Sequence, residues 1–231
     1  MEWLIHSDAG LMVRLLIGCA IFGILASVDL YRNGSAARRW REYAFLLLCV
    51  AVALGYGILN DQLTVGLSWE YFYYGKDLMS VLGQQTPPDD WLLRLGAAKV
   101  GMKATWSAGL IIGVVLLFAN NPGKGLPPLP FRKLLGFLPL MLLITVAGAV
   151  VLGIIGYFGG LRFVTSEFDV LIAENLWRPY RFMAVFGIHL GGYVGGLVGT
   201  IAVAIMVRRK RNVLREGARE FQEVQERRVG Q

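Results

Sequence analysis

The chain has 231 residues, of which 55% are hydrophobic and only 17% are charged, and its formal net charge is +7. A water-soluble domain usually has about a quarter of its residues charged, so this composition excludes an ordinary soluble protein. The basic residues gather at the ends of apolar blocks, which argues against nucleic-acid binding, and the two cysteines make neither a disulfide framework nor a metal cluster.

The apolar residues fall into five blocks that are long enough, with their flanks, to cross a bilayer. The hydrocarbon core takes about 20 residues of helix, and a segment inside lipid must satisfy its own peptide groups, which favours helices. We therefore predict an all-α integral membrane bundle with five transmembrane helices. The predicted spans are residues 9–30, 43–59, 104–119, 134–158 and 182–207.

The predicted bundle occupies residues 1–207, with outer loops at 60–103 and 159–181, and a basic helical tail follows at 208–231. Fifteen of the 23 lysines and arginines lie in the remaining connections and in the tail. Because basic segments stay on the cytoplasmic side of a membrane, we expect the N-terminus outside and the C-terminus in the cytoplasm. The expected location is a bacterial inner membrane.

The stretch after the second predicted span carries most of the unusual side chains. Asp61 follows the apolar block, and Glu70 lies among aromatic residues that include Trp69. Residues 64–73 alternate with a period of two, which favours an extended piece, and the alternative is that Ser68 caps a short helix. We expect the rings to form an aromatic belt at the headgroup level, with a wall that contacts a ligand as the alternative.

The third predicted helix is longer than its apolar part. The turn before it, residues 83–90, contains two prolines, and Asp89 or Asp90 is expected to cap the helix. We predict that this helix covers residues 91–119. Its first dozen residues, which include Arg94, are too charged for the lipid interior.

The fifth predicted span has two different faces. Small residues recur at every fourth position, a pattern that lets another helix come close. These residues are Gly187, Gly191, Gly195 and Gly199. His189 and Tyr193 lie on a different face near the outer end. An ionisable residue inside a membrane is a functional candidate, and a neutral histidine with one hydrogen-bond partner is the alternative.

The predicted tail begins with four basic residues, and this charge is enough to hold anionic lipid headgroups. They are Arg208, Arg209, Lys210 and Arg211. The alternative is that these residues only anchor the topology of the chain.

Several short motifs occur along the chain: Asp61-Gln62-x-Thr64, Glu70-Tyr71-Phe72, Ala104-Thr105-Trp106, the segment 109–113, and His189 and Tyr193 with Gly195 and Gly196. Together they resemble the motifs of a family of uncharacterised bacterial multi-pass membrane proteins. Trp69 stands where that family often has proline. The resemblance implies a multi-pass membrane fold and brings no activity to this chain.

Three hypotheses for function remain. The first is a non-enzymatic structural or accessory component that contacts lipid or partner proteins. The second is a membrane-embedded enzyme or metal site with Asp61, Glu70 and His189 as candidates, because a carboxylate and an imidazole can share proton transfer or a divalent ion. The third is a small-solute or ion transporter or channel subunit with Asp61, His189 and Tyr193 along its path.

The expected partners follow from the same features. They are the lipid bilayer, anionic headgroups at the tail, and a second copy of the chain or a partner membrane protein. Trp69, Arg94 and Tyr193 are candidate binding residues, and we expect no cofactor, no metal motif and no nucleic acid. Convergence of Asp61, Glu70 and His189 around one cavity would distinguish among the three hypotheses.

Overall fold

The computed structural model describes residues 8–121, 127–161 and 176–229, and within these ranges the chain forms helices and no β-strand. The helices are α2 (Asp8–Asn33), η1 (Gly34–Ala36), α3 (Arg39–Leu67), α4 (Trp69–Tyr73), α5 (Met79–Leu82), α6 (Asp90–Ala119), α7 (Phe131–Leu135), α8 (Leu138–Tyr157) and α10 (Pro179–Val229).

Five helical stretches in the described part of the chain are long and apolar enough to cross a membrane. They are Ala9–Ala36, Arg39–Leu67, Asp90–Ala119, Phe131–Tyr157 and Pro179–Phe221. The prediction of an all-α membrane bundle with five spans is therefore confirmed. Of the predicted outer loop at 159–181, residues 162–175 lie outside the described ranges.

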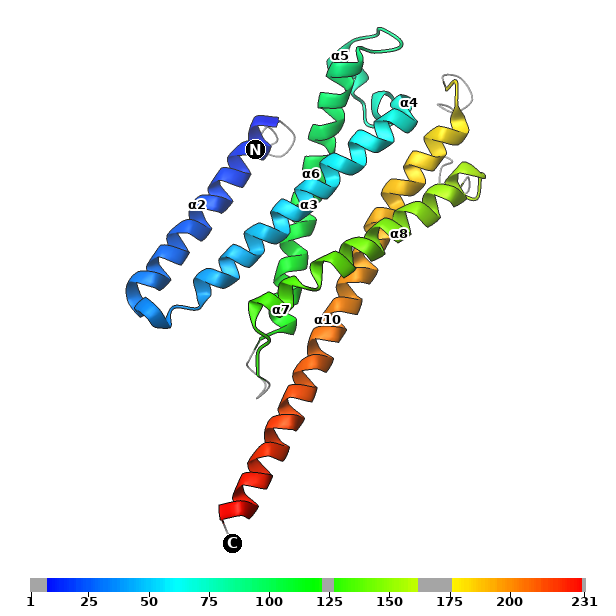
Figure 1. Cartoon of the computed structure of the whole chain (residues 1–231). Coiled ribbons are helices and arrows are strands. Elements are labelled where there is room, and N and C mark those ends of the chain that lie inside the picture. Colours follow the sequence, from blue (N-terminus) through cyan, green and yellow to red (C-terminus); the bar gives the residue numbers. More distant parts are fainter. Residues whose placement is uncertain (1–7, 122–126, 162–175, 230–231) are drawn as a thin grey trace.

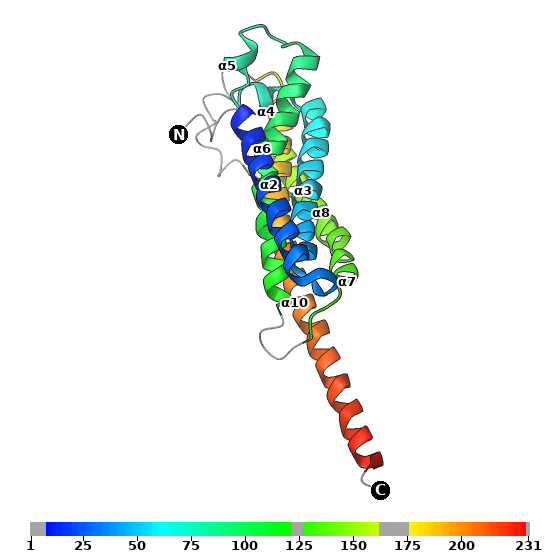
Figure 2. The same ribbon diagram turned by 90° about the vertical axis from the view of Figure 1, so that its left-hand side faces the viewer.

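The bundle is built from two tightly packed helix pairs. α3 packs along α6, and α8 packs along α10, and these are the two most extensive helix contacts. α10 joins the pairs because it also contacts α6, α3 and α4, whereas α2 packs mainly on α3 at one side (Figure 1). Figure 2 shows α10 continuing as one helix far beyond the other helices.

Glycines bring the backbones together within each pair. A Cβ atom at Gly148 of α8 would lie 2.6 Å from the carbonyl oxygen of Gly191 in α10, closer than real Cβ atoms approach. A Cβ atom at Gly109 of α6 would lie 2.6 Å from the carbonyl oxygen of Cys49 in α3. Gly187, Gly191, Gly195 and Gly199 all face atoms of α8. The two interfaces therefore depend on the absence of side chains at these positions.

α3 is longer than its predicted apolar block, and this changes the position of Asp61. The helix continues to Leu67, so Asp61 lies inside a helix and not in an outer loop. The predicted extended piece at 64–73 is wrong, because only Ser68 has extended backbone angles and α4 follows at once. The short helix of the alternative is present, but the Ser68 side chain makes no capping hydrogen bond. The alternation misled because both faces of α4 are buried.

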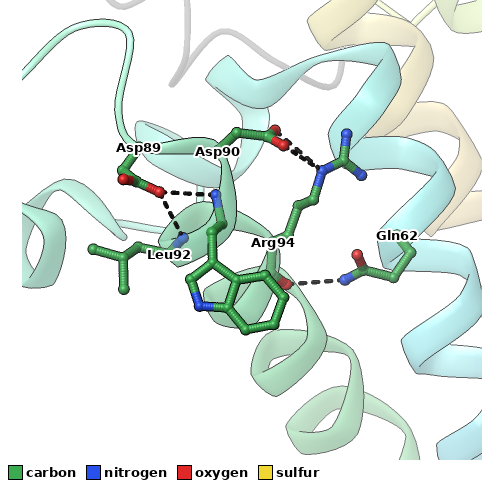
Figure 3. Close-up of polar contacts among 6 residues, drawn as sticks. Gln62, Asp89, Asp90, Leu92 and Arg94 are labelled. Carbon is green, nitrogen blue, oxygen red and sulfur yellow. Dashed lines mark hydrogen bonds and ion pairs between the residues drawn. The ribbon is translucent and has the colours of Figure 1, made fainter.

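The other helix ends lie close to their predicted positions. Asp89 caps α6, since its Oδ1 accepts hydrogen bonds from the backbone N–H groups of Trp91 (2.9 Å) and Leu92 (3.2 Å) (Figure 3). The fourth predicted span is divided: α7 ends at Leu135, and α8 starts at Leu138 with a proline in its first turn. Proline suits that position because the first N–H groups of a helix have no partner within it.

Candidate functional site

Asp61 and His189 lie side by side between the two helix pairs. Asp61 comes from α3 and His189 from α10, and Oδ1 of the carboxylate lies 3.7 Å from Nε2 of the imidazole. The two side chains are only 3% and 10% exposed. Two of the three candidate catalytic residues are therefore brought together inside the bundle.

The polar atoms of this pair are incompletely hydrogen-bonded. The side-chain amide of Asn60 donates to Oδ1 of Asp61 at 3.2 Å. Oδ2 of Asp61 and Nε2 of His189 are buried and have no hydrogen-bond partner among the described residues. Oδ2 faces α6, because a Cβ atom at Gly101 would lie 3.1 Å from it. A buried polar atom without a partner costs about 1–3 kcal/mol, so the pair is suited to accept a further donor or a cation.

Aromatic rings of α4 cover the imidazole. The Tyr71 ring stacks on His189 with ring centres 4.8 Å apart and an interplanar angle of 13°, and Phe72 meets it edge-on at 5.8 Å. Phe182 of α10 packs against the edge of Tyr71. These rings are buried in the bundle, so α4 contributes a roof over the pair instead of the expected belt at the lipid surface.

Lys76 lies just outside this roof. Its Nζ is 5.4 Å from the centre of the Tyr71 ring. Loss of hydration lowers the pKa of Lys76, and the negative charge of Asp61 opposes this shift, although the residue as a whole is exposed. Burial raises the pKa of the Tyr71 hydroxyl, and the charge of Asp61 adds to the effect. Lys76 is therefore a cation that lies beside this site outside the spans.

Two further tyrosines lie within electrostatic range of the Asp61 carboxylate, Tyr56 on α3 and Tyr193 on α10. The hydroxyl of Tyr56 lies against α10, since a Cβ atom at Gly192 would be 2.9 Å from it. Tyr193 is 52% exposed, so this candidate binding residue only partly faces the cluster. The cluster is thus an acid, an imidazole and several phenols around one junction of helices.

Glu70 does not join the cluster. Its Oε1 accepts a hydrogen bond from the backbone N–H of Trp177 at 2.6 Å, which ties α4 to the segment before α10. Trp69 packs edge-on against the Trp177 ring at 6.0 Å. The rings that contact His189 come from Tyr71 and Phe72, whereas the carboxylate of Glu70 is bound to the backbone of Trp177. The sequence left open whether the three catalytic candidates converge; in the structure Asp61 and His189 lie together and Glu70 lies apart from them.

Arg94 is engaged at the surface of α6. Its Nε lies 2.9 Å from Oδ2 of Asp90, one turn earlier, and its backbone carbonyl accepts a hydrogen bond from the side chain of Gln62 at 2.9 Å (Figure 3). Its side chain is 39% exposed. This candidate binding residue stabilises the contact between α6 and α3, and its guanidinium is paired with Asp90 instead of with the Asp61–His189 pair.

The basic residues of the predicted tail have two different environments. Arg208, Arg209 and Lys210 are exposed on α10, as a role in headgroup binding requires. Arg211 is only 3% exposed, and its guanidinium donates to the backbone carbonyls of Ala119 (2.7 Å), Asn121 (2.6 Å) and Pro127 (3.0 Å). Arg211 therefore closes the end of α6 and is not available to a lipid headgroup.

A large apolar groove runs along an exposed side of the junction. It has a volume of about 780 Å³ and lies between α3 and α8, with residues of α10 at its base. Leu59 and Leu63 of α3 and Val150 of α8 line it and are more than half exposed. Asn60 also lines it, so the residue that donates to Asp61 separates the groove from the pair.

The donor set of the site is small. In residues 8–121, 127–161 and 176–229, no three His, Cys, Asp or Glu side chains come together as metal ligands. Asp61 and His189 offer two protein ligands, whereas a structural zinc site takes four and a catalytic zinc site three. The geometry fits a proton or a hydrogen-bonding group better than a tightly held metal ion.

Sequence reasoning missed part of this site. Asn60, Tyr56 and Lys76 were not singled out, and Tyr71 was placed in the aromatic belt. The spacing of Tyr56 and Asn60 at four residues was a signal that both lie on one helical face. No sequence pattern indicated that Tyr71 and Phe72 contact His189, because the position of α4 depends on the helices that it packs against.

The chain was compared with protein-family models, with curated proteins and with solved structures, and none of the three comparisons found a match.

Proposed function

We propose that this chain is a non-enzymatic multi-pass protein of a bacterial inner membrane, related to the uncharacterised family that its motifs resemble. In this proposal it is a structural or accessory component that contacts lipid or a partner membrane protein. Its N-terminus lies outside and its C-terminal tail lies in the cytoplasm, because most of the basic residues lie in the tail and in the two connections on the same side of the bundle as the tail.

The apolar groove between α3 and α8 carries this proposal. It is lined almost entirely by aliphatic and aromatic side chains, and it lies between two helix pairs, each of which is closely packed within itself. Lipid tails are as apolar as the side chains, so the hydrophobic effect does not drive helices together inside a membrane. Helices in lipid associate instead through close packing of their surfaces. A groove of this shape offers unused packing surface to another helix or to acyl chains.

The positions of the polar candidates agree with a non-catalytic role. Glu70 is hydrogen-bonded to the Trp177 backbone, and Arg94 is paired with Asp90. These groups hold helices and loops in place. The enzyme hypothesis is left with the Asp61–His189 pair alone.

Photocrosslinking from the groove tests the proposal. A photoreactive amino acid at Leu63 or Val150, which lie on opposite walls, should give the same discrete adduct in native membranes. The matched control is Ile21 of α2, which is 49% exposed and does not line the groove. The proposal fails if the groove positions and Ile21 give indistinguishable products.

A second candidate function is a proton-linked transporter or channel subunit, and the Asp61–His189 pair favours it. Polar groups that are buried within membrane helices often mark paths of protons or ions. Each residue of this pair has a buried polar atom without a hydrogen-bond partner among the described residues, and Lys76 lies on the outer side of the aromatic roof.

Flux measurements distinguish the second candidate from the first. The purified chain is reconstituted into liposomes that contain a pH-sensitive dye, and a proton gradient is imposed. Under the second candidate, Asp61→Asn and His189→Gln each abolish proton movement, while Glu70→Gln retains it. Liposomes that remain as tight as empty ones would remove this candidate and leave the first in place.

A further inference from the structure

A second cavity lies at the opposite end of the bundle from the Asp61–His189 pair. It has a volume of about 880 Å³ and is formed by the first residues of α3, the last turns of α6 and the segment that leads into α7. Figure 1 shows these segments at the end of the bundle from which α10 extends. The cavity therefore opens where a membrane-spanning bundle meets water.

One part of the cavity is strongly basic. Arg38, Arg39 and Arg41 line it and are exposed, whereas Glu42 is the acidic residue of the lining. These arginines stand at the amino end of α3, where the helix dipole adds partial positive charge. Anions are therefore attracted to this part of the cavity.

A buried acid beside the start of α3 is already engaged. Asp29 of α2 accepts hydrogen bonds from the side chain of Asn33 (2.8 Å) and from the backbone N–H of Trp40 (3.2 Å). Its charge also interacts with Arg39. Asp29 thus fixes the start of α3 against α2 and leaves an excess of positive charge on the cavity side.

The other part of the cavity is apolar. Val114, Leu117 and Phe118 of α6 and Phe131 of α7 line it. These residues belong to stretches that are long and apolar enough to span a membrane. The cavity is consequently amphipathic, with cations next to a surface that suits hydrocarbon.

Buried hydrogen bonds fix the rim of the cavity. Asn120, only 6% exposed, donates to the carbonyl of Leu129 at 3.1 Å and accepts from its N–H at 2.8 Å. The buried Arg211 holds the carbonyls of Ala119 and Asn121 on the other side. A site held by satisfied buried groups needs little reorganisation to bind a ligand.

We propose that this cavity binds the phosphate headgroup of an anionic glycerophospholipid, with the upper part of its acyl chains against α6. Arginine suits this role because its planar guanidinium pairs with two phosphate oxygens at once. The apolar wall distinguishes a lipid from free phosphate, which would gain nothing from Val114, Leu117 or Phe118. The site is separate from the apolar groove, from the Asp61–His189 pair and from the exposed basic residues of the tail.

Native mass spectrometry of the full chain in detergent tests the proposal, with phosphatidylglycerol, phosphatidylcholine and inorganic phosphate as probes. We expect the wild-type chain to retain phosphatidylglycerol in preference to phosphatidylcholine. The variant Arg38→Gln/Arg39→Gln/Arg41→Gln should bind phosphatidylglycerol roughly fivefold more weakly for each arginine removed. Helical content and elution volume show whether the variant remains folded.

Two matched variants separate this site from general attraction to charge. Arg208→Gln/Arg209→Gln/Lys210→Gln removes three exposed cations from the tail, which attract headgroups by charge without an apolar wall, and should reduce retention less than the triple variant of the cavity does. Val114→Trp keeps every arginine but fills the apolar part of the cavity, and it should also reduce retention. The proposal is overturned if both triple variants weaken binding equally, if phosphatidylcholine binds as well, or if inorganic phosphate displaces the lipid and Val114→Trp has no effect.

Discussion

The carboxylate of Asp61 lies 3.7 Å from Nε2 of His189, and this contact links the α3–α6 pair to the α8–α10 pair. Both side chains are almost completely buried. The distance is slightly too long for a hydrogen bond, so a small approach of the two helix pairs would form one. A relative movement of the two helix pairs would therefore change the distance between Asp61 and His189.

A double-mutant cycle measures how strongly this junction couples the pairs. We expect Asp61→Asn and His189→Gln to show a coupling energy of about 0.5–3 kcal/mol, because neighbouring buried polar groups are not energetically independent. The free energies of unfolding are measured by titration with a denaturing detergent. Asp61→Asn combined with Arg209→Gln, on the exposed tail, should be additive, and additivity in both cycles would contradict the coupling.

Gly191→Ala should destabilise the α8–α10 pair by about 1–3 kcal/mol, the usual cost of overpacking. The added methyl group would collide with the carbonyl oxygen of Gly148. Gly55→Ala is the control, because a Cβ atom there meets nothing within 4 Å. Alanine favours helix over glycine, so the control should be neutral or slightly stabilising in thermal unfolding followed by circular dichroism.

Arg211→Gln should destabilise the chain by about 2–4 kcal/mol, since hydrogen bonds from a buried charged donor to three backbone carbonyls, that of the buried Ala119 among them, are lost. Arg209→Gln removes the same charge from an exposed neighbour and should change stability by less than about 0.5 kcal/mol. Both variants are compared by detergent-induced unfolding. If the two variants were equally stable, the hydrogen bonds of Arg211 to the end of α6 would not contribute to stability.

Glu70→Ala should loosen the segment that leads into α10, because the backbone N–H of Trp177 loses its acceptor. A hydrogen bond to a charged group contributes about 1.5–3 kcal/mol. Limited proteolysis near Trp177 should become faster in Glu70→Ala, while Glu70→Gln, which keeps an acceptor oxygen, should resemble the wild type. Faster cleavage in both variants would instead show that the negative charge of Glu70 is what matters.

Much of the fold follows from local chemistry. The five spans were predictable because lipid requires about 20 apolar residues with internally satisfied backbone groups. Asp89 was predictable as the cap of α6 because its carboxylate completes the hydrogen bonds of the first turn. The extended piece at 64–73 was wrong because a period of two in side chains says little where both faces of a short helix are buried.

The amino-acid sequence by itself determined that this protein is a bundle of five membrane-length helices, since hydrophobic length depends only on neighbours along the chain. Tertiary structure alone decided that Asp61 meets His189, that Glu70 turns to Trp177 and that Arg211 is buried. Each of these contacts joins residues far apart in the chain. They depend on how closely glycine-lined helices approach one another, and no local pattern specifies that distance.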